Sequence, residues 1–442
     1  MKVLGISEGF HDAAVCVLDD TKIHYASSSE RYSRIKGDKW VHKNQWPKHK
    51  FDIVSYYEKP FRKNLRRLYA GQKWQKPRVD YDVSFRHHES HAAAGYYTSP
   101  FDECNILVID AIGEWDTMSI WEAKNNRMKK KVTWKYPHSL GLLYSAVTKR
   151  IGLKPNEDEY ITMGMAAFGE PIHDLEEQLW ENNHRGVGDI YPNARPEDLA
   201  ASIQALYERE LLKLVALCPS ENLIIMGGCA LNCVANSKIQ DKKIWIMPAS
   251  GDAGSALGAA ALIQKTKLQW KTPYLGLDIK RTINPKNVVE ELLERKVCGV
   301  ANRKAEFGPR ALGNRSLLGD PRYDIKDTVN TIKRRQKFRP FAPAILEEYK
   351  DEYFEGPMNE YMQFVAKAKH DHSSVTHVDG TARVQVVTKD CKSIIRPILE
   401  EWYEQTQCPM ILNTSLNIKG QPIVNTWKHA KDFEKEYDVK VF

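Results

Sequence analysis

The stretch from Arg86 to Thr117, RHHESHAAAGYYTSPFDECNILVIDAIGEWDT, decides how the first part of this chain folds. His87 and His91 stand four apart among small helix-forming residues, and such positions share one helix face, so both imidazoles can reach one metal ion. An apolar, strand-like run follows from Asn105 to Ile109 and ends in Asp110. A carboxylate at a buried strand end beside two histidines predicts a mixed nitrogen and oxygen metal site. Chance spacing of surface histidines and a turn-capping Asp110 are the alternative.

Length and composition indicate a globular protein of two or more domains. The chain has 442 residues, too many for one core, with 42% hydrophobic and 28% charged residues. No apolar run reaches the roughly 20 residues that span a bilayer, and the opening MKVLGISEGF lacks the apolar core of a signal peptide. The eight cysteines form no CxxC pair, which is typical of reduced thiols. We therefore expect a cytoplasmic protein with no membrane partner.

The chain opens with three short apolar runs, Val3–Ser7, Ala13–Leu18 and Ile23–Ser27. They predict a β-meander that resembles the start of the actin/Hsp70-like nucleotide-binding fold. In that fold the first hairpin turn lies near the nucleotide phosphates. His11 and Asp12 stand in this turn, and ordinary turn chemistry is the alternative explanation for them.

A strongly basic segment runs from Arg34 to Arg78. It holds fourteen Lys or Arg residues against three Asp or Glu, so it accounts for more than the net charge of +8. Cations supply phosphate contacts and aromatic rings stack on bases, so the segment predicts binding to a polyanion such as DNA. The alternative is a solvated amphipathic helix over residues 52–70, interrupted by Pro60. The interleaved aromatic residues are Trp40, Trp46, Phe51, Tyr56, Tyr57, Phe61, Tyr69 and Trp74.

Two strand-to-helix junctions follow in the middle of the chain. The strand Leu223–Met226 leads into Gly227 and Gly228, where backbone amides can approach a phosphate or ribose, with Asn232 close behind. The strand Ile244–Met247 leads to Asp252, which stands between two glycines before a helix rich in Ala and Gly. Asp252 is the expected last metal ligand; by default such an aspartate caps the helix.

Cationic residues in Gly/Pro-rich or strand-edge motifs mark the last third of the chain. Guanidinium groups clamp phosphate with two hydrogen bonds and a lysine adds a point charge, so these residues predict a site for two anions. Surface salt bridges are the alternative for any one of them. The cations are Arg310, Arg315, Lys333, Arg339 and Arg383, and Asn413 and Ser415 follow a short apolar strand beside which a phosphate or nucleotide can bind.

Several collinear motifs together resemble the carbamoyltransferases of the nodulation and antibiotic-tailoring type. In the first part they are GISEGFHDAAVCVL, EYITMGMAAFG, GGCALN and GDAGSALGAA. In the second part they are EFGPRALGNRS (306–316), KFRPFAP (337–343), HVDGTARVQ (377–385) and LNTSLN (412–417). The resemblance covers almost the whole chain.

The resemblance implies an α/β protein of two domains. Residues 1–275 would form an actin/Hsp70-like (ASKHA, Kae1-like) domain that transfers the carbamoyl group, and residues 285–442 a smaller YrdC-like α+β domain. The second domain would make carbamoyladenylate from ATP, with Mg²⁺, and carbamoyl phosphate. The first would hold a metal ion, usually iron in this family, on His87, His91, Asp110 and Asp252. His11 beside Asp12 would be the general base, and Lys36 would steady the leaving group.

The motifs do not identify the hydroxyl that accepts the carbamoyl group. The basic segment favours a hydroxymethylated base in DNA, such as 5-hydroxymethylcytosine, presented single-stranded or flipped out. The same chemistry on a nucleotide, sugar or antibiotic hydroxyl is the alternative. Two other classes stay open: a tRNA threonylcarbamoyl transferase, and a non-catalytic nucleotide-binding switch that would not need the four metal ligands. The sequence leaves the oligomeric state open, a homodimer included.

Overall fold

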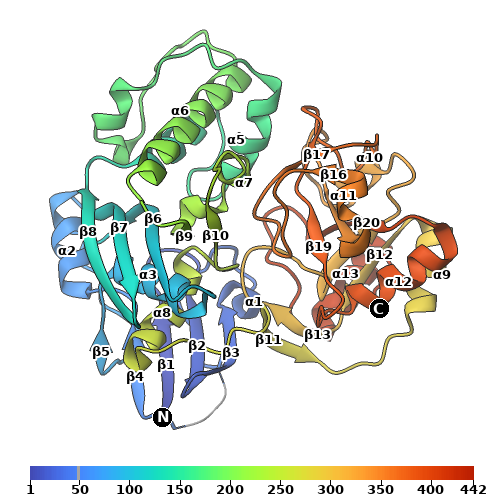
Figure 1. The fold of residues 1–442 in the computed structure, drawn as a ribbon, viewed down its shortest axis with the longest axis horizontal. Helices are drawn as coiled ribbons and strands as arrows, with labels where there is room; N and C mark the ends of the chain where they lie inside the picture. The colour runs from blue at the N-terminus through green and yellow to red at the C-terminus, as the bar shows by residue number, and fades with distance from the viewer. Residues whose placement is uncertain (47–49) are drawn as a thin grey trace. The chain divides into compact units, whose positions relative to one another are not determined.

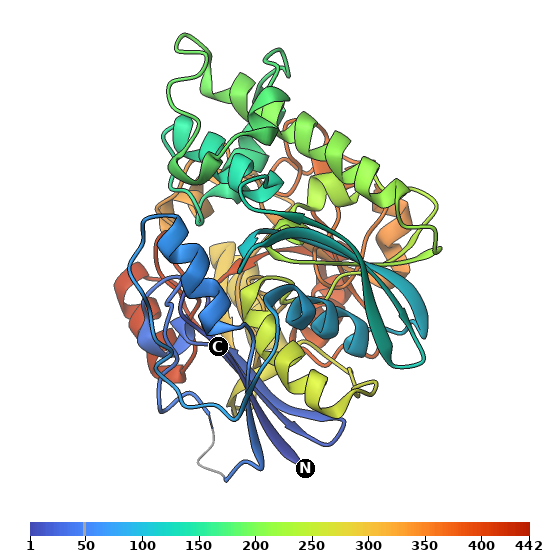
Figure 2. The same cartoon turned by 90° about the vertical axis from the view of Figure 1, so that its left-hand side faces the viewer.

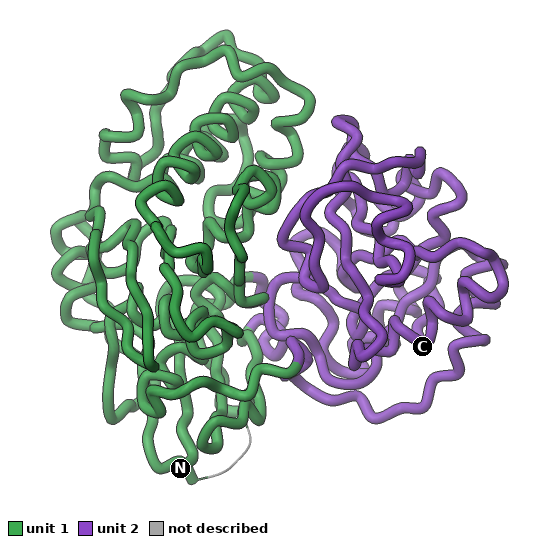
Figure 3. Tube along the Cα trace, in the orientation of Figure 1, with its two compact units in different colours: residues 1–29, 37–271 green, residues 30–36, 272–442 purple. Residues whose placement is uncertain are grey.

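A computed structural model describes residues 1–46 and 50–442 of the chain (Figure 1). The chain divides into two compact units, residues 1–29 with 37–271 and residues 30–36 with 272–442 (Figure 3). This division falls just before the expected boundary between 275 and 285. The grouping of residues 30–36 with the second unit was not expected from the sequence. Residues 47–49 of the basic segment lie outside the described part.

The first unit holds two five-stranded sheets, counted over the described residues, with orders β3-β2-β1-β4-β5 and β8-β7-β6-β9-β10. In each sheet an antiparallel meander is followed by two strands parallel to its first strand. This duplicated arrangement confirms the predicted actin/Hsp70-like fold. The strands are β1 (Lys2–Ser7), β2 (Ala14–Asp19), β3 (Lys22–Ser28), β4 (Ile53–Tyr56), β5 (Val83–Ser84), β6 (Glu103–Gly113), β7 (Asp116–Lys124), β8 (Arg127–Lys135), β9 (Asn222–Met226) and β10 (Lys243–Trp245).

Two helices pack against each other between these sheets (Figure 2): α3 lies on the second sheet and α8 on the first. Helices α4 and α6 pack together on the other face of the second sheet. The helices of this unit are α2 (Pro60–Tyr69), α3 (His87–Thr98), α4 (Leu140–Arg150), α5 (Glu159–Met165), α6 (Pro196–Ala216), α7 (Cys233–Asn236) and α8 (Asp252–Gln264), with short 3₁₀ turns η1 (Ala166–Phe168), η2 (Glu177–Trp180), η3 (Asn183–Arg185) and η4 (Gly228–Leu231).

Small residues make the central packing possible. A Cβ on Gly258 of α8 would stand 1.8 Å from the carbonyl oxygen of Ser90 in α3. A Cβ on Gly5 of β1 would stand 1.9 Å from the carbonyl oxygen of Ala256. The Ala/Gly composition of α8 therefore lets this helix approach both a sheet and the histidine-bearing helix.

The second unit is an α+β body, as predicted, built on a five-stranded sheet in the order β12-β14-β20-β15-β19 among the residues described. Its likeness to YrdC stays a prediction. Its elements are α1 (Glu30–Ser33), β11 (Tyr274–Ile279), α9 (Pro285–Arg295), β12 (Val297–Ala301), β13 (Arg303–Glu306), β14 (Arg315–Gly319), α10 (Lys326–Ile332), β15 (Ala342–Leu346), η5 (Glu347–Tyr349), α11 (Lys350–Tyr353), β16 (Phe354–Glu355), β17 (Ala366–Ala368), β18 (Thr381–Ala382), β19 (Gln385–Val387), α12 (Ile395–Thr406), β20 (Met410–Ser415) and α13 (Trp427–Tyr437).

The alternative of one amphipathic helix over residues 52–70 is wrong. Residues Ile53–Tyr56 form strand β4, and the helix begins only at Pro60. Proline lacks the amide hydrogen that a helix interior needs, but it fits the first helical position. Within the described ranges, no helix combines the length and the apolar character that crossing a bilayer requires.

The contact at Gly258 leads to a first prediction. We expect Gly258→Ala to lower the free energy of unfolding by about 1–3 kcal/mol, because the added methyl overpacks against the backbone of α3. Gly164→Ala in α5 is the matched control, since its Cβ would meet open space. That variant should be neutral or more stable by about 0.5–1 kcal/mol. Thermal and urea unfolding measure both; equal stability of the two variants would contradict the packing argument.

Candidate functional site

Helix α3 brings two imidazoles together in the core of the first unit. His87 and His91 are almost fully buried, and their Nε2 atoms lie 3.1 Å apart. The helix begins at His87, so both side chains come from its first two turns. The spacing of four residues therefore places both rings on one face, as predicted.

Two aspartates from other elements complete the cluster. Asp110 lies in β6 and its Oδ2 is 2.9 Å from His87 Nε2 and 3.4 Å from His91 Nε2. Asp252 is the first residue of α8, and its Oδ1 is 3.3 Å from both nitrogens. One ligand atom from each of the four buried residues lies within 4.8 Å of the others. Two imidazole nitrogens and two carboxylate oxygens suit a first-row divalent cation, but they do not separate iron from zinc or manganese.

The histidines and aspartates of this cluster shift each other's pKa values. Burial lowers the pKa of His87, but Asp252 and Asp110 outweigh it and raise that pKa well above 6.5. Burial raises the pKa of Asp110, but hydrogen bonds to His87 and His91 bring it well below its usual range. Buried carboxylates need a positive partner. Protons on the imidazoles or a metal cation can each supply that charge.

The outer ring nitrogens of both histidines face oxygen atoms. His91 Nδ1 donates to the carbonyl oxygen of Ser250 at 3.1 Å, which leaves Nε2 as the ligand atom. His87 Nδ1 lies 3.6 Å from Oε2 of Glu58, and the other oxygen of Glu58 accepts from Lys63 Nζ at 2.5 Å. Hydrogen bonds to such oxygens orient metal-binding imidazoles. The separation between His87 and Glu58 is longer than a hydrogen bond, so Glu58 acts on this ring through its charge. Glu58 was not predicted from the sequence, because no local pattern distinguishes an acid that follows strand β4.

The turn after β1 holds the predicted base. His11 Nδ1 lies 2.9 Å from Oδ2 of Asp12. Burial lowers the pKa of His11, but Asp12, with Asp252 and Asp110 further off, raises it to about 9. The ring therefore carries a proton at neutral pH, and its role as general base stays a prediction. Lys36 belongs to the second unit, where its ammonium pairs with Glu30 at 2.8 Å, and its role at the leaving group stays a prediction.

The glycine turn after β9 packs against the strand that carries Asp110. Gly227 has φ of 93°, and a Cβ there would stand 2.1 Å from the carbonyl oxygen of Ile109. A Cβ on Gly228 would lie 3.4 Å from Oδ1 of Asp110, so this backbone borders the metal cluster. Asn232 caps α7 by accepting from the amide of Ala235 at 3.0 Å. Its side chain thus has a local structural role beside the predicted one.

Lys333 is a buried cation in the second unit. Its Nζ donates to the carbonyl oxygen and hydroxyl of Ser415 and to both side-chain and backbone oxygens of Asn417, and these acceptors are all uncharged. Burial, together with Arg335 and Arg339, holds the pKa of Lys333 well below 10.5. The three ammonium hydrogens therefore already face protein oxygens, and contact between Lys333 and a phosphate stays a prediction.

The other predicted anion-binding residues separate into two groups. Arg310, Arg339 and Arg383 are partly exposed, and Arg383 Nε is buried with no hydrogen-bond partner among the described residues. Asn413 is buried and its Nδ2 donates to Gln385 Oε1 at 2.6 Å. These placements leave the partly exposed arginines as the predicted phosphate contacts.

The prediction that Arg315 binds the cofactor is wrong, because the structure buries this side chain. This side chain is fully buried and its guanidinium donates to five backbone carbonyls, those of Leu277, Asn302, Arg303, Asn314 and Asn425. Its donors are thus committed to bracing the loops around β14. Glu306, the first residue of the same motif, has a related role that the sequence analysis missed. Its Oε1 accepts from the amides of Leu312, Asn314 and Arg315.

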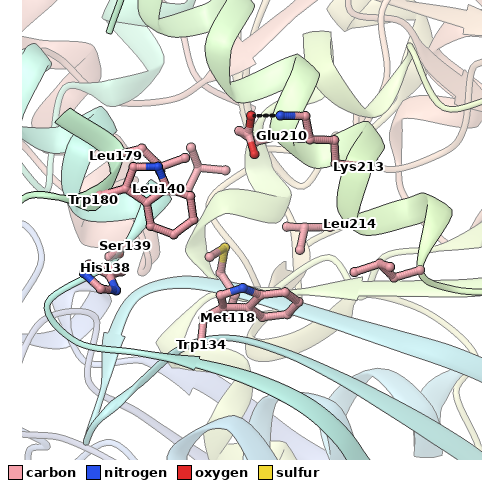
Figure 4. A pocket seen from close by; sticks show the side chains of 11 residues that line it. Met118, Trp134, His138, Ser139, Leu140, Leu179, Trp180, Glu210, Lys213 and Leu214 are labelled. Carbon is pink, nitrogen blue, oxygen red and sulfur yellow. Dashed lines mark hydrogen bonds and ion pairs between the residues drawn. The ribbon is translucent and has the colours of Figure 1, made fainter. Parts of the chain in front are cut away.

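An apolar pocket of about 220 Å³ lies on the first unit, beside α6 (Figure 4). The ion pair between Glu210 and Lys213, 2.8 Å long, stands at its edge. None of the predicted site residues lines this pocket. It is lined by Met118, Trp134, His138, Ser139, Leu140, Leu179, Trp180, Glu210, Lys213, Leu214 and Leu217.

Comparison with known proteins now adds the family. The chain matches the family description "Carbamoyltransferase N-terminus" over residues 39–187 and 188–261, and "Carbamoyltransferase C-terminus" over residues 289–442. The chain belongs to the carbamoyltransferase family. It is therefore an enzyme that transfers a carbamoyl group, as the motifs predicted.

Two relatives match this chain over most of its length. An uncharacterized protein of Synechocystis sp. is 30% identical over 97% of this chain and 93% of its own length. Nodulation protein NolNO of Sinorhizobium fredii is 30% identical over 94% of this chain and 75% of its own length. Among solved structures, HypF of T. kodakarensis matches 60% of this chain and 47% of its own at 11% identity, with a TM-score of 0.36, which is too low to carry an argument.

The four-residue cluster predicts stoichiometric metal binding by this enzyme. We expect one divalent ion per chain, and Asp252→Asn should weaken binding by more than roughly 100-fold, since outer partners alone are worth about 10–100-fold. Because the pKa of His87 is raised, protons compete with the ion, and affinity should rise as pH rises above 6.5. Elemental analysis and competitive chelation measure both. The exposed Asp102→Asn is the control, and unchanged binding in Asp252→Asn would refute the site.

Glu58 predicts a smaller effect through His87. We expect Glu58→Gln to weaken metal affinity by roughly 10–100-fold, because the carboxylate that faces His87 Nδ1 is lost. The exposed Glu122→Gln, which breaks only the surface pair with Lys131, should leave affinity unchanged. Chelator competition, read beside thermal unfolding, separates weaker binding from general destabilisation. Loss of stability with wild-type affinity would assign Glu58 to folding alone.

Proposed function

We propose that this carbamoyltransferase is an ATP-dependent O-carbamoyltransferase that works through carbamoyladenylate. Its proposed substrates are ATP with Mg²⁺, carbamoyl phosphate and an acceptor hydroxyl. The observation that carries the proposal is the convergence of His87, His91, Asp110 and Asp252 on one buried point. A cation held there can act on a substrate carbonyl or phosphate.

The first half of the proposed reaction belongs to the second unit. For the atoms to balance, water releases carbamate and phosphate from carbamoyl phosphate. A carbamate oxygen then bonds to the α-phosphorus of ATP while the bond to pyrophosphate breaks. Lys333 and the arginines Arg310, Arg339 and Arg383 would hold the crowded phosphates, because preformed cations stabilise negative charge without reorganising.

The second half belongs to the first unit. The acceptor oxygen bonds to the carbamoyl carbon, the bond from that carbon to the phosphate oxygen breaks, and AMP leaves. When bound, a divalent ion such as Fe²⁺ would polarise the carbamoyl group or the adenylate phosphate. His11 and Asp12 would accept the hydroxyl proton. Because the raised pKa favours the protonated ring, His11 would have to lose that proton before it could act as the base.

The proposed acceptor is a hydroxymethylated base in DNA, such as 5-hydroxymethylcytosine. It offers a primary hydroxyl on a polyanion, which fits the cations that stay at the surface between residues 34 and 78. A base must leave the stack to meet a buried site. An uncharged small-molecule acceptor would have no phosphates for the basic segment to contact.

Two variants separate the half-reactions and test the proposal. With ATP, carbamoyl phosphate, Mg²⁺, Fe²⁺ and hydroxymethylcytosine-containing DNA, we expect pyrophosphate release and a carbamoylated nucleoside seen by mass spectrometry. Lys333→Met should reduce pyrophosphate release by roughly 10²–10³-fold, the scale of losing a charge-stabilising donor. His91→Ala should release pyrophosphate normally but form no adduct.

Lys337→Met is the matched control for the lysine, because Lys337 is exposed and pairs only loosely with Asp327 at 3.4 Å. Full activity of Lys333→Met would remove the assigned anion site. Adduct formation by His91→Ala would remove the metal from the transfer step. Pyrophosphate release that needs carbamoyl phosphate, without an adduct, would keep the enzyme class and replace DNA by a small-molecule acceptor.

A further inference from the structure

Helix α2 is amphipathic, but its polar face is buried and its apolar face is exposed. Its buried side chains are polar: Lys63, Asn64 and Arg66. Apolar side chains normally face inward, and a contiguous exposed set marks a surface that another molecule covers. The exposed fractions of its large apolar residues are 65% for Phe61, 44% for Leu65, 51% for Leu68 and 71% for Tyr69.

The polar inner face of α2 holds a return loop in place. Lys63 Nζ is bonded to Glu58, and Asn64 exchanges two hydrogen bonds with the backbone of Gln75, at 2.9 and 2.8 Å. The loop therefore runs back along the helix, and the ring of Trp74 lies edge-on to that of Phe61, with centroids 6.2 Å apart. Trp74 is 47% exposed. Two solvent-facing rings are thus fixed side by side.

The surroundings of these rings are cationic. Of the three acids between residues 34 and 78, Glu58 and Asp38 are buried and paired with Lys63 and His42. They do little to offset the cations that remain at the surface. A cation–aromatic contact stands nearby in sequence, where the Arg78 guanidinium lies 4.0 Å from the ring of Trp40. The exposed or partly exposed cations of α2 and its return loop are Arg62, Arg67, Lys73 and Lys76.

This surface is tied to the turn that carries the predicted base. The carbonyl oxygen of Gly9 accepts from Lys63 Nζ at 3.3 Å and from Gln75 Nε2 at 2.8 Å, and the Gly9 amide donates to the carbonyl oxygen of Lys39. Gly9 lies two residues before His11. On the other side, Glu114 accepts from Arg62 Nε at 3.2 Å and from the His87 amide at 3.3 Å. The segment therefore touches both elements of the proposed transfer site.

We propose that the face formed by Phe61, Trp74, Arg62, Arg67, Lys73 and Lys76 binds single-stranded DNA beside the acceptor base. The inference rests on the proposed DNA acceptor. Exposed rings stack on bases whose faces are free, and interleaved cations contact the phosphates. In a duplex those faces are covered by neighbouring pairs, so a single strand fits this surface better. The cations flank the rings here, which matches a strand whose bases and phosphates alternate.

Fluorescence anisotropy of a labelled single-stranded oligonucleotide with the full-length enzyme tests the surface. Phe61→Ala/Trp74→Ala should weaken binding by roughly tenfold or more, since each stacked ring contributes substantially to affinity. Lys73→Glu/Lys76→Glu should weaken binding and flatten its salt dependence. Lys129→Glu/Lys131→Glu on β8 makes the same charge change on another basic stretch and should have a smaller effect. Wild-type duplex binding should be weaker than single-strand binding.

The outcomes distinguish a failure of the proposed DNA-binding face from a failure of the proposed DNA acceptor. Wild-type affinity in the double-ring variant would overturn the surface and leave the DNA acceptor standing. No oligonucleotide binding by the wild type at low salt would overturn both. If the wild type binds anionic phosphatidylserine vesicles instead of DNA, and the binding depends on Phe61 and Trp74, the face is a membrane-binding surface. That result would overturn the proposal that the face binds DNA. Metal content and pyrophosphate release must stay at wild-type levels in every variant, because these exposed residues belong to neither half-site.

Discussion

Two carboxylates buried around one imidazole, Asp110 and Asp252 beside His87, are the constraint on which the first unit depends. Neither charge can stay in the core without a positive partner within contact distance. Close packing between the elements that carry these residues brings the side chains together. Gly258 lets α8 approach α3, and Gly227 lets its turn lie against β6, so that donors from three elements reach one point. A bulkier core would bury more apolar area and separate the ligands.

Local periodicity was enough to predict the centre of the site. The four-residue spacing of His87 and His91 and the strand that ends in Asp110 depend on helix and strand geometry alone. Asp252 was expected from its place between two glycines after a strand, although an aspartate that only caps a helix looks the same in sequence. Glu58 could not be found, because its partner His87 is 29 residues away and the contact depends on how the segment after β4 folds.

Arg315 shows why a motif can mislead about a side chain. In sequence it stands in a Gly-rich loop like a phosphate clamp. In the structure its partners are backbone carbonyls at positions as distant as 277 and 425, which only the folded sheet brings together. The basic segment misled in a similar way. Lys63 and Arg66 are buried, and Arg34 donates to the carbonyls of Pro422 and Ile423, so composition overstated the exposed charge.

The two units carry opposite electrostatic needs. In the first, Asp110 and Asp252 concentrate negative charge in the core, and a cation relieves it. In the second, Lys333 is buried among uncharged oxygens near two arginines, and an anion relieves it. In the proposed reaction, an adenylate would be made where phosphates are gathered and would be consumed where a carbonyl or phosphate is polarised. The second step gains from a site that already holds a cation, and the first gains from one that holds positive side chains. These opposite charges are the physical reason for proposing that one reaction is divided between the two units.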